Sequence, residues 1–536
     1  MTLLRIEDLK LRIGQAELLK GVSLHVEAGE ILGLVGESGS GKSITALSIL
    51  RLLPPGAAVS GRILLDGEDL TAANEARMRA VRGGQVGVVF QEPMTALNPL
   101  MRIGDQVAET VALHRPVGRA EALKLAAQAL ERAGLPNAQF PLDRYPHELS
   151  GGQRQRVAIA MATALKPRLL IADEPTTALD VTTQAQILTL LRDLAREEGA
   201  GLILITHDLA VVAEMADRVA IMREGEVVEQ GLTAALLGAP RHPYSKKLAE
   251  DAVLATAAPP AKATDSAPVL EARNVVRAYA GRRAAPWRRT KPFRAVDGVS
   301  LTVRSGETVG LVGESGSGKS TLLRAVLGLE ALQGGEVRLD AALFPPASPA
   351  QARQMRRKIQ AVFQDPFGSF DPRWRVEDLV AEPFHLMERP PAGAERRARV
   401  QAMLARVGLP PDAAERYPHQ FSGGQRQRIA IARALITEPK LVVLDEAVSA
   451  LDVTVRAQVL ELLARLSQEL GVSYLFVTHD LGVVRAICHR VLVMQGGRIV
   501  EEGATEDVFL RPQHAYTRAL LAATPDLARA LAARGA

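Results

Sequence analysis

The octapeptide GESGSGKS occupies residues 36–43 and returns unchanged at residues 313–320. In the first copy it follows the apolar run ILGLV, residues 31–35, and precedes a stretch with helical apolar spacing, residues 42–53. Glycines let such a loop wrap a phosphate group with its backbone N–H groups pointing inward, and the start of the helix adds positive potential. Two glycine-rich phosphate-binding loops, each between a strand and a helix, are therefore predicted.

The sequence around each loop repeats as well. Ser150 and Ser422 stand 272 residues apart, as do Glu174 and Glu446. A repeat of this length indicates a duplicated domain rather than a short solenoid unit. The repeated segments are YPHELSGGQRQRVAIA from Tyr145 and YPHQFSGGQRQRIAIA from Tyr417, LLIADEPTTALDVT from Leu169 and LVVLDEAVSALDVT from Leu441, THDLAVV from Thr206 and THDLGVV from Thr478, and HPYSKKL from His242 and HAYTRAL from His514.

Each copy is predicted to be an α/β domain. Helical segments alternate with short apolar runs, which indicates a mostly parallel sheet flanked by helices. In the first copy the predicted strands are residues 31–35, 86–90, 169–172 and 202–205. We predict one domain over residues 1–250, an Ala/Pro-rich linker over residues 251–268 and a second domain over residues 269–536.

Composition narrows the class of protein. The chain has 536 residues with 65 basic and 60 acidic side chains, and this net charge of +5 is too weak to demand a nucleic-acid partner. A single cysteine, Cys488, excludes an internal disulfide framework and a four-cysteine metal site, and favours a reducing setting. No signal peptide and no run approaching about 18 apolar residues is expected, so the chain is not predicted to form a pore itself.

The polar residues of the two loops carry the predicted chemistry. Lys42 and Lys319 would reach the β- and γ-phosphates of a nucleotide, and Ser43 and Ser320 would each place a hydroxyl on Mg²⁺. The other predicted nucleotide-binding residues of the loops are Gly36, Ser38, Gly39, Gly41, Gly313, Ser315, Gly316, Gly318 and Thr321.

Two acids follow an apolar strand in each copy, Asp173-Glu174 and Asp445-Glu446. They stand at the carboxyl end of the strand, where ligands bind in open α/β sheets. The first acid of each pair suits the Mg²⁺ shell, usually through water. The second is placed to orient and deprotonate an attacking water, which makes Glu174 and Glu446 the predicted catalytic bases.

A histidine and a glutamine also follow predicted strands in each copy. A neutral imidazole at His207 and His479 could contact the γ-phosphate and hold the water and the glutamate in register. The amides of Gln91 and Gln364 could meet Mg²⁺ or the attacking water. A lone histidine or glutamine is more often structural, so the prediction depends on the recurrence of the whole set.

The segments LSGGQ, residues 149–153, and FSGGQ, residues 421–425, predict the start of a helix. The serine can cap the helix and the glutamine can complete a capping box, while bare glycine backbone lets a phosphate approach. Together with the loops, acids and histidines, this set resembles the ABC ATPases over nearly the whole chain. The resemblance implies P-loop NTPase domains, each with an added helical subdomain and an N-terminal antiparallel β part.

The resemblance also implies residue roles. The signature residues would be Ser150, Gly151, Gly152, Gln153, Ser422, Gly423, Gly424 and Gln425. Each ATP would lie between the loop of one domain and the signature of the other, so that Lys42 pairs with Ser422 and Lys319 with Ser150. The loop residues Asp180 and Asp452 would join the halves. Adenine would stack on Tyr279 in the second half, whereas the first half offers only Ile13.

Finer likeness points to the oligopeptide/dipeptide importer subfamily. It rests on the YPH segments, on EPMTALNP at 92–99 and DPFGSFDP at 365–372, and on the HPY and HAY segments near each domain end. Two departures stand out: the cysteine cluster of many members is missing, and Glu446 is followed by Ala447 where the first copy has Pro175. Two competent ATP sites are still expected, and the second could turn over more slowly than the first.

The resemblance implies an ATP-hydrolysing subunit of a bacterial uptake transporter for peptides or similar small solutes. ATP and Mg²⁺ would be its cofactors and two transmembrane permease subunits its direct partners. A solute-binding protein would act indirectly, and the chain would sit on the cytoplasmic face of the inner membrane. The alternatives are an exporter ATPase and a twin-domain ABC protein acting on ribosomes or DNA. The basic insertion at residues 281–294, with Trp287, is either a solvated loop or a contact for lipid headgroups or a permease.

Overall fold

The computed structural model divides the chain into two compact units. The first comprises residues 1–253 and 525–536, and the second comprises residues 254–524. Most of the predicted linker lies outside the described residues, as do Trp287 with part of the basic insertion and parts of the segments after Gln91 and Gln364. The structure describes residues 2–91, 96–177, 179–254, 266–280, 283–285, 288–289, 292–346, 348–365, 368–449 and 451–535.

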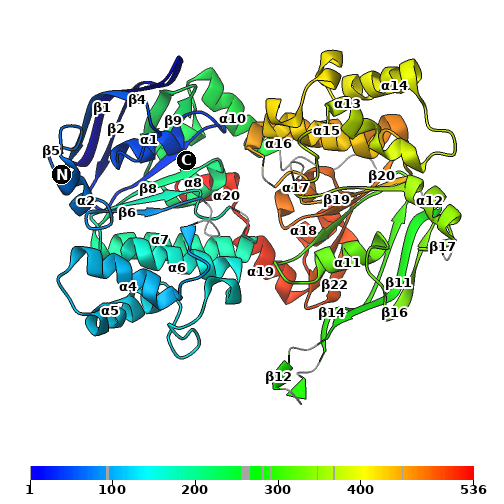
Figure 1. Ribbon diagram of the computed structural model, residues 1–536, viewed down its shortest axis with the longest axis horizontal. Coiled ribbons are helices and arrows are strands. Elements are labelled where there is room, and N and C mark those ends of the chain that lie inside the picture. Colours follow the sequence, from blue (N-terminus) through cyan, green and yellow to red (C-terminus); the bar gives the residue numbers. More distant parts are fainter. Residues whose placement is uncertain are drawn as a thin grey trace. The chain divides into compact units, whose positions relative to one another are not determined.

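A six-stranded sheet forms the centre of the first unit (Figure 1). Five neighbouring strands run parallel and only the edge strand β10 is antiparallel. Helices and a second sheet cover both faces, which explains why the inner strands are uninterrupted apolar runs. In spatial order the strands are β10 (Glu226–Leu232), β9 (Arg218–Arg223), β3 (Ile31–Val35), β8 (Gly201–Thr206), β7 (Leu169–Asp173) and β6 (Val86–Val89).

An antiparallel sheet covers one face of this central sheet. Its order is β2 (Ala16–Glu27), β1 (Thr2–Ile13), β4 (Ala57–Leu65) and β5 (Glu68–Asp69). Helix α1 (Lys42–Ile49) lies between the two sheets (Figure 1), and buried side chains from all three elements form one apolar cluster. Helix α2 (Glu75–Val81) adds Met78 and Val81 to it.

Helices cover the opposite face and build a separate subdomain. The helices over the sheet are α6 (Gly151–Thr163), α7 (Val181–Glu198), α8 (Leu209–Met215), α9 (Thr233–Gly238) and α10 (Pro243–Leu254). Helices α4 (Ile103–His114) and α5 (Arg119–Arg132) pack on one another and on α6 around their own apolar cluster. The fold class inferred from the sequence, including the helical subdomain and the antiparallel part, is confirmed.

The second unit repeats this architecture. Its central sheet has the order β18 (Ile359–Val362), β19 (Leu441–Asp445), β20 (Ser473–Val477), β15 (Thr308–Val312), β21 (Arg490–Gln495) and β22 (Arg498–Ala504). Its antiparallel sheet has the order β14 (Phe293–Arg304), β11 (Pro268–Tyr279), β16 (Gly334–Leu339) and β17 (Ala342–Phe344). The helices are α11 (Lys319–Val326), α12 (Pro349–Lys358), α13 (Val376–Ala381), α14 (Gly393–Arg406), α15 (Gly423–Leu435), α16 (Val453–Leu470), α17 (Leu481–Ile487), α18 (Thr505–Leu510) and α19 (Ala515–Ala523).

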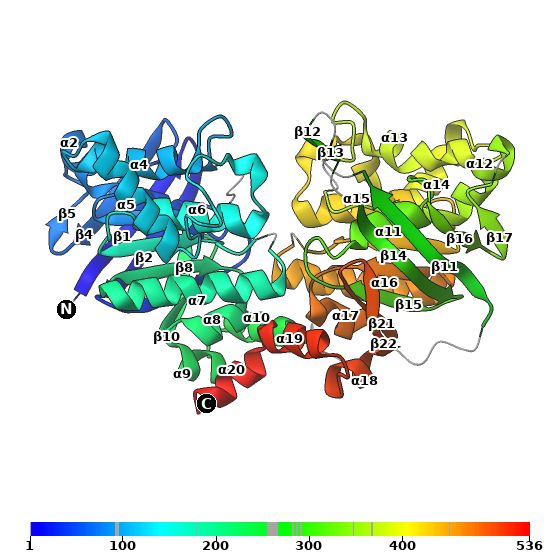
Figure 2. The ribbon, with the colours of Figure 1, turned by 90° about the horizontal axis from the view of Figure 1, so that it is seen from below.

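The last helix of the chain, α20 (Leu527–Ala533), belongs to the first unit. It lies beside α8 in both views (Figures 1 and 2) and contacts α9 as well, and Leu527 and Ala530 are buried in the same apolar cluster as Val212. The Arg529 guanidinium lies 3.6 Å from the Glu214 carboxylate of α8. We predicted from the sequence that residues 525–536 belong to the second domain, because apolar spacing alone does not reveal which surface a short helix covers.

We expect Leu527→Ala to loosen α8. Truncating a buried leucine costs roughly 2–3 kcal/mol of local stability, so amide exchange over residues 209–215 should quicken by on the order of tenfold or more. Hydrogen–deuterium exchange with mass spectrometry measures this. Helix α17, the matching helix of the second unit, provides the internal control and should keep its exchange rate. Unchanged protection of α8 would contradict the assignment of α20 to the first unit.

Candidate functional site

Each phosphate loop connects a buried strand to a helix and encloses a buried lysine. Lys42 is 6% exposed, and its Nζ donates hydrogen bonds to the carbonyl oxygens of Gly36 (2.7 Å) and Glu37 (2.8 Å). Gly41 adopts φ +105°, and a Cβ there would meet Leu19 at 2.8 Å. Because a buried ammonium needs polar partners, the loop carbonyls define where this positive charge lies.

The second loop has the same geometry. Lys319 is also 6% exposed, and its Nζ donates to the carbonyl oxygens of Gly313 (2.6 Å) and Glu314 (2.8 Å). Gly318 adopts φ +108°, and a Cβ there would lie 2.1 Å from the Ala295 carbonyl oxygen. Both copies therefore need glycine at the residue before the lysine, and both present the start of a helix together with a fixed positive charge.

The paired acids stand where β7 and β19 end. Side chains alternate along a strand, so two successive acids can serve one edge only if the backbone turns between them. Glu174 and Glu446 do turn, with φ +45° and +47°, in the left-handed region that side chains other than glycine rarely occupy. Each is held there by its N–H, which donates to Ile205 (2.9 Å) or Val477 (2.8 Å) on the neighbouring strand. Such strain persists where the surroundings over-determine it, commonly at functional sites.

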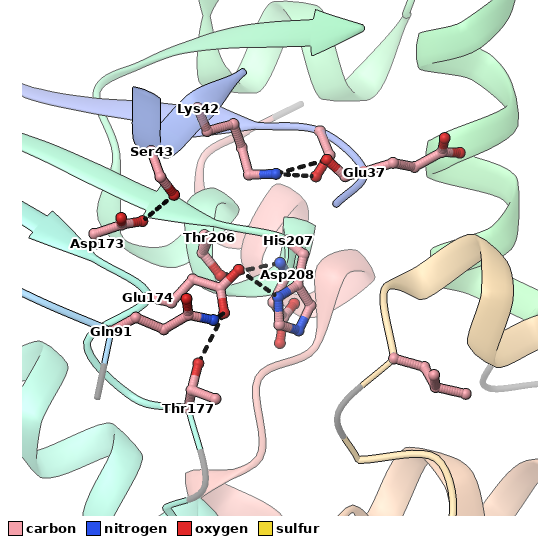
Figure 3. Close-up of polar contacts among 12 residues, drawn as sticks. Glu37, Lys42, Ser43, Gln91, Asp173, Glu174, Thr177, Thr206, His207 and Asp208 are labelled. Carbon is pink, nitrogen blue, oxygen red and sulfur yellow. Dashed lines mark hydrogen bonds and ion pairs between the residues drawn. The ribbon is translucent and has the colours of Figure 1, made fainter. Parts of the chain in front are cut away.

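Three side chains contact the Glu174 carboxylate (Figure 3). The Gln91 amide donates to Oε2 at 2.8 Å and the Thr177 hydroxyl donates to Oε2 at 2.9 Å. His207 Nδ1 lies 3.3 Å from Oε1. Residues at the ends of three neighbouring strands, β6, β7 and β8, thus meet at a single carboxylate, and nearby the Ser43 hydroxyl donates to Asp173 Oδ1 at 3.1 Å.

The second copy brings the corresponding glutamine and histidine to Glu446, but the third contact of the glutamate differs. The Gln364 amide donates to Glu446 Oε2 at 2.8 Å, and His479 Nδ1 lies 3.1 Å from Oε1. Ser449 stands at the position of Thr177, but its hydroxyl donates to the main-chain oxygen of Glu446 at 2.9 Å. Among the described residues, two side chains therefore hold the second carboxylate, where three hold the first.

The electrostatics separate the two acids of each pair. Burial acts to raise the pKa of Glu174, but contacts with His207 and Thr177 and the charge of Lys42 outweigh burial and hold this pKa at about 2. The pKa of Glu446 is likewise lowered, against burial, chiefly by His479. Both glutamates are therefore ionised at neutral pH and can accept a hydrogen bond from water.

The first acids shift the other way. Burial raises the pKa of Asp173, and the hydrogen bond from Ser43 opposes this rise. Burial and then repulsion from Glu446 raise the pKa of Asp445 to about 6, with partial relief from the Lys319 ammonium. Burial makes the charged form of such a carboxylate costly, and a bound cation would offset that cost.

The signature segments form helix starts as predicted. The Ser150 hydroxyl accepts the Gln153 N–H at 3.3 Å, and Gln153 Oε1 accepts the Ser150 N–H at 2.9 Å. Ser422 and Gln425 make the same capping box at 3.4 and 3.1 Å. These reciprocal bonds leave the exposed helix tip with a fixed shape.

The two glycines of each signature serve different purposes. A Cβ on Gly152 would lie 2.4 Å from Thr183, and one on Gly424 would lie 2.3 Å from Val455, so close packing on the next helix requires glycine there. A Cβ on Gly151 would meet nothing nearer than 3.7 Å, and at Gly423 nothing within 4 Å. Packing does not require the first glycine, which agrees with a role in ligand approach.

Some further residues lie apart from this set. Tyr279, predicted to stack on adenine, donates a hydrogen bond from its hydroxyl to Glu330 (2.8 Å), and its ring faces the Arg277 guanidinium at 4.8 Å. Ile13 packs against the apolar cluster between the sheets. Asp180 and Asp452 cap α7 and α16 by accepting N–H groups at 2.9 and 3.0 Å. The adenine contact stays a prediction.

Sequence reasoning missed three side chains that contact the site: Thr177, Tyr244 and Tyr516. Thr177 holds the Glu174 carboxylate, and the two tyrosines contact the phosphate loops. For Thr177 the available signal was the hydroxyl retained at Ser449 in the repeat. For the tyrosines it was the recurrence of the HPY and HAY segments.

Known proteins resemble this chain over most of its length. The ABC transporter family model matches residues 19–177 and 296–449, and the model for the C-terminal region of oligopeptide/dipeptide transporters matches residues 500–535. The glutathione import ATP-binding protein GsiA of Escherichia coli K12 is 47% identical over 95% of this chain and 86% of its own length. GsiA of Shigella sonnei gives the same values. Among solved structures, the ATP-binding cassette MJ0796 with ADP and Pi is 30% identical, with a TM-score of 0.39 over 43% of this chain and 98% of its own.

Within the described residues, no helix combines the length and apolar character needed to cross a bilayer. The matched regions contain both phosphate loops and both acid pairs, and the matched C-terminal region includes the HAY segment. The chain belongs to the ABC transporter family, as an ATP-hydrolysing protein with two fused ATP-binding domains of the oligopeptide/dipeptide transporter type.

Proposed function

We propose that this chain energises bacterial uptake of peptides or similar small solutes, such as glutathione, by hydrolysing ATP. The observation that carries the proposal is the presence of two complete sets of loop lysine, paired acids, glutamine and histidine. The C-terminal region of oligopeptide/dipeptide transporters favours import over export, as do the relatives named for glutathione import. The nature of the solute is set by other chains.

The residues of each site have separable tasks. Loop N–H groups and the lysine hold the β- and γ-phosphates, which leaves the γ-phosphate facing the paired acids. Glu174 accepts a hydrogen bond from the attacking water and orients it, while Gln91, Thr177 and His207 fix the carboxylate. Glu446 has the same task with Gln364 and His479. Fixing the carboxylate before ATP arrives saves reorganisation during the reaction.

Mg²⁺ fits the adjacent oxygen atoms. In the first site the Ser43 hydroxyl and the Asp173 carboxylate lie together, and Ser320 and Asp445 occupy the corresponding positions of the second copy. Mg²⁺ prefers one or two carboxylates completed by phosphate oxygens and water. Within the described residues, no group of three or more His, Cys, Asp or Glu could form a metal cage. Phosphate oxygens of the nucleotide and water would complete the shell. Bound Mg²⁺ would neutralise charge on the phosphates.

The signature tips supply the proposed second half of each site. We place Ser422, Gly423 and Gly424 against the nucleotide on Lys42, and Ser150, Gly151 and Gly152 against that on Lys319. The support is the exposed, capped helix start and the room beside Gly151 and Gly423. Fusion of the two domains makes their encounter intramolecular and raises its effective concentration.

The proposed partners follow from the transporter family. Two permease subunits would receive the motion of the domains, and a solute-binding protein would deliver cargo to them. The chain would work at the cytoplasmic face of the inner membrane, and no nucleic-acid partner is proposed. Co-purification with membrane subunits would support this assignment, and co-purification with ribosomes instead would contradict it.

The first test removes both catalytic carboxylates. Glu174→Gln combined with Glu446→Gln should lower steady-state phosphate release by about 100-fold or more, because the general-base contribution is lost while nucleotide binding is kept. Retained ATP on the isolated protein and the rate of phosphate release are the measurements. Glu224→Gln, at an exposed carboxylate 72% accessible, is the matched control. Undiminished turnover in the double variant would refute the catalytic assignment.

The second test concerns Asp445. Its folded pKa of about 6 lies above the ordinary aspartate pKa of 3.8, so its ionisation opposes folding at neutral pH and not in acid. Asp445→Asn should therefore raise the free energy of unfolding above pH 6, by up to about 3 kcal/mol. This gain should disappear as the pH falls towards 4.

Denaturant unfolding of the nucleotide-free protein between pH 4 and 8 measures the gain. Asp173→Asn should gain less, because the Ser43 hydrogen bond already favours the charged form of Asp173. A gain from Asp445→Asn that does not vary with pH would contradict the proposed cost of ionisation.

A further inference from the structure

A buried tyrosine contacts each phosphate loop from the C-terminal part of its unit. Tyr244 lies in the first turn of α10 and Tyr516 in the first turn of α19, and they are 6% and 9% exposed. The Tyr244 hydroxyl accepts the main-chain N–H of Glu37 at 3.1 Å, and the Tyr516 hydroxyl accepts that of Glu314 at 2.8 Å. These are the tyrosines of the HPY and HAY segments, to which the proposed catalytic steps assign no task.

The tyrosine and the loop lysine hold opposite ends of one peptide group. The peptide that joins Gly36 to Glu37 offers its carbonyl to Lys42 at 2.7 Å and its N–H to Tyr244. In the second unit the peptide from Gly313 to Glu314 offers its carbonyl to Lys319 at 2.6 Å and its N–H to Tyr516. A planar peptide held at both polar ends cannot rotate without breaking both bonds. Its orientation determines how the following N–H groups of the loop face a phosphate.

The tyrosine is itself fixed by the edge strand of the sheet. Glu229 of β10 accepts the N–H groups of Arg241 (3.0 Å) and His242 (3.1 Å), and His242 Nδ1 accepts the Tyr244 N–H at 3.1 Å. The Arg223 guanidinium lies 5.1 Å from the centre of the Tyr244 ring. A continuous series of hydrogen bonds therefore runs from the edge strand to the phosphate loop.

The second unit repeats this series. Glu501 of β22 accepts the N–H groups of Gln513 (2.7 Å) and His514 (3.0 Å), and His514 Nδ1 accepts the Tyr516 N–H at 3.2 Å. The same arrangement in two units of differing sequence indicates a requirement of the site. A chance contact of one tyrosine would not explain it.

We propose that Tyr244 and Tyr516 are positioning residues for nucleotide binding, which hold each phosphate loop in the shape that receives the β- and γ-phosphates. The inference rests on the proposed ATP-hydrolysing function and adds to it two residues outside the loops, acids and signatures. The hydroxyls contact the loop and not the reacting atoms. Their loss should weaken ATP binding and leave the rate of the bound state nearly unchanged.

The experiment compares full-length Tyr244→Phe/Tyr516→Phe with wild type, since phenylalanine keeps the ring packing and removes only the hydroxyl. One hydrogen bond of ordinary net strength corresponds to about a 3- to 10-fold change. The Kd for ATP with Mg²⁺, measured on the Glu174→Gln/Glu446→Gln background, should rise by that factor. In protein that keeps both glutamates, KM should rise by the same factor and kcat should change less than about twofold. Tyr474→Phe is the matched control, because that buried hydroxyl has no hydrogen-bond partner among the described residues.

The single variants distinguish a local effect on one loop from a change in overall stability. In Tyr244→Phe, amide exchange over residues 36–43 should quicken while residues 313–320 keep their rate, and Tyr516→Phe should give the reverse. Unchanged ATP affinity in the double Phe variant, or equal quickening of both loops in a single variant, would overturn the inference. If wild-type protein itself failed to bind and hydrolyse ATP, the proposed function would fail instead.

Discussion

The site depends on the burial of parallel strands on both faces. Strands β3, β7 and β8 are enclosed along their whole length, so polar groups can appear only where the chain leaves the sheet. Because the strands are parallel and adjacent, their carboxyl ends meet at one edge. The phosphate loop, the paired acids and the histidine follow these three strands, and Gln91 follows the neighbouring β6. The order of these four strands thus brings site residues that are more than 100 positions apart in the sequence to one edge of the sheet.

Motifs that carry their own local geometry could be predicted from the sequence. The phosphate loop and the capping box depend on glycine conformation and on bonds within a few residues, so residues 36–43 and 150–153 specify them alone. The meeting of Gln91, Glu174 and His207 could be anticipated, because each follows an apolar run that reads as a parallel strand. The repeat strengthened each inference, since two copies share one geometry.

Features set by packing between distant segments could not be predicted. The left-handed backbone of Glu174 is imposed by a bond to Ile205 on another strand. The need for Gly152 depends on Thr183 of the next helix, which no local pattern reveals. Helix α20 has apolar residues suited to many surfaces, and only the assembled fold places it on α8. The adjacent copies also differ in ways that sequence likeness hides: Thr177 reaches a carboxylate where Ser449 reaches a carbonyl.

The place of α20 has a consequence for biosynthesis. Domains generally fold in order as they leave the ribosome, the N-terminal one first. Here the apolar cluster of the first unit includes Leu527 and Ala530, which are synthesised only after the whole second unit, residues 254–524. The apolar face of the first unit that α20 covers therefore stays uncovered while the second unit is translated. A chain that stops within the second unit lacks α20 and leaves that apolar face exposed, and exposed apolar surface promotes aggregation.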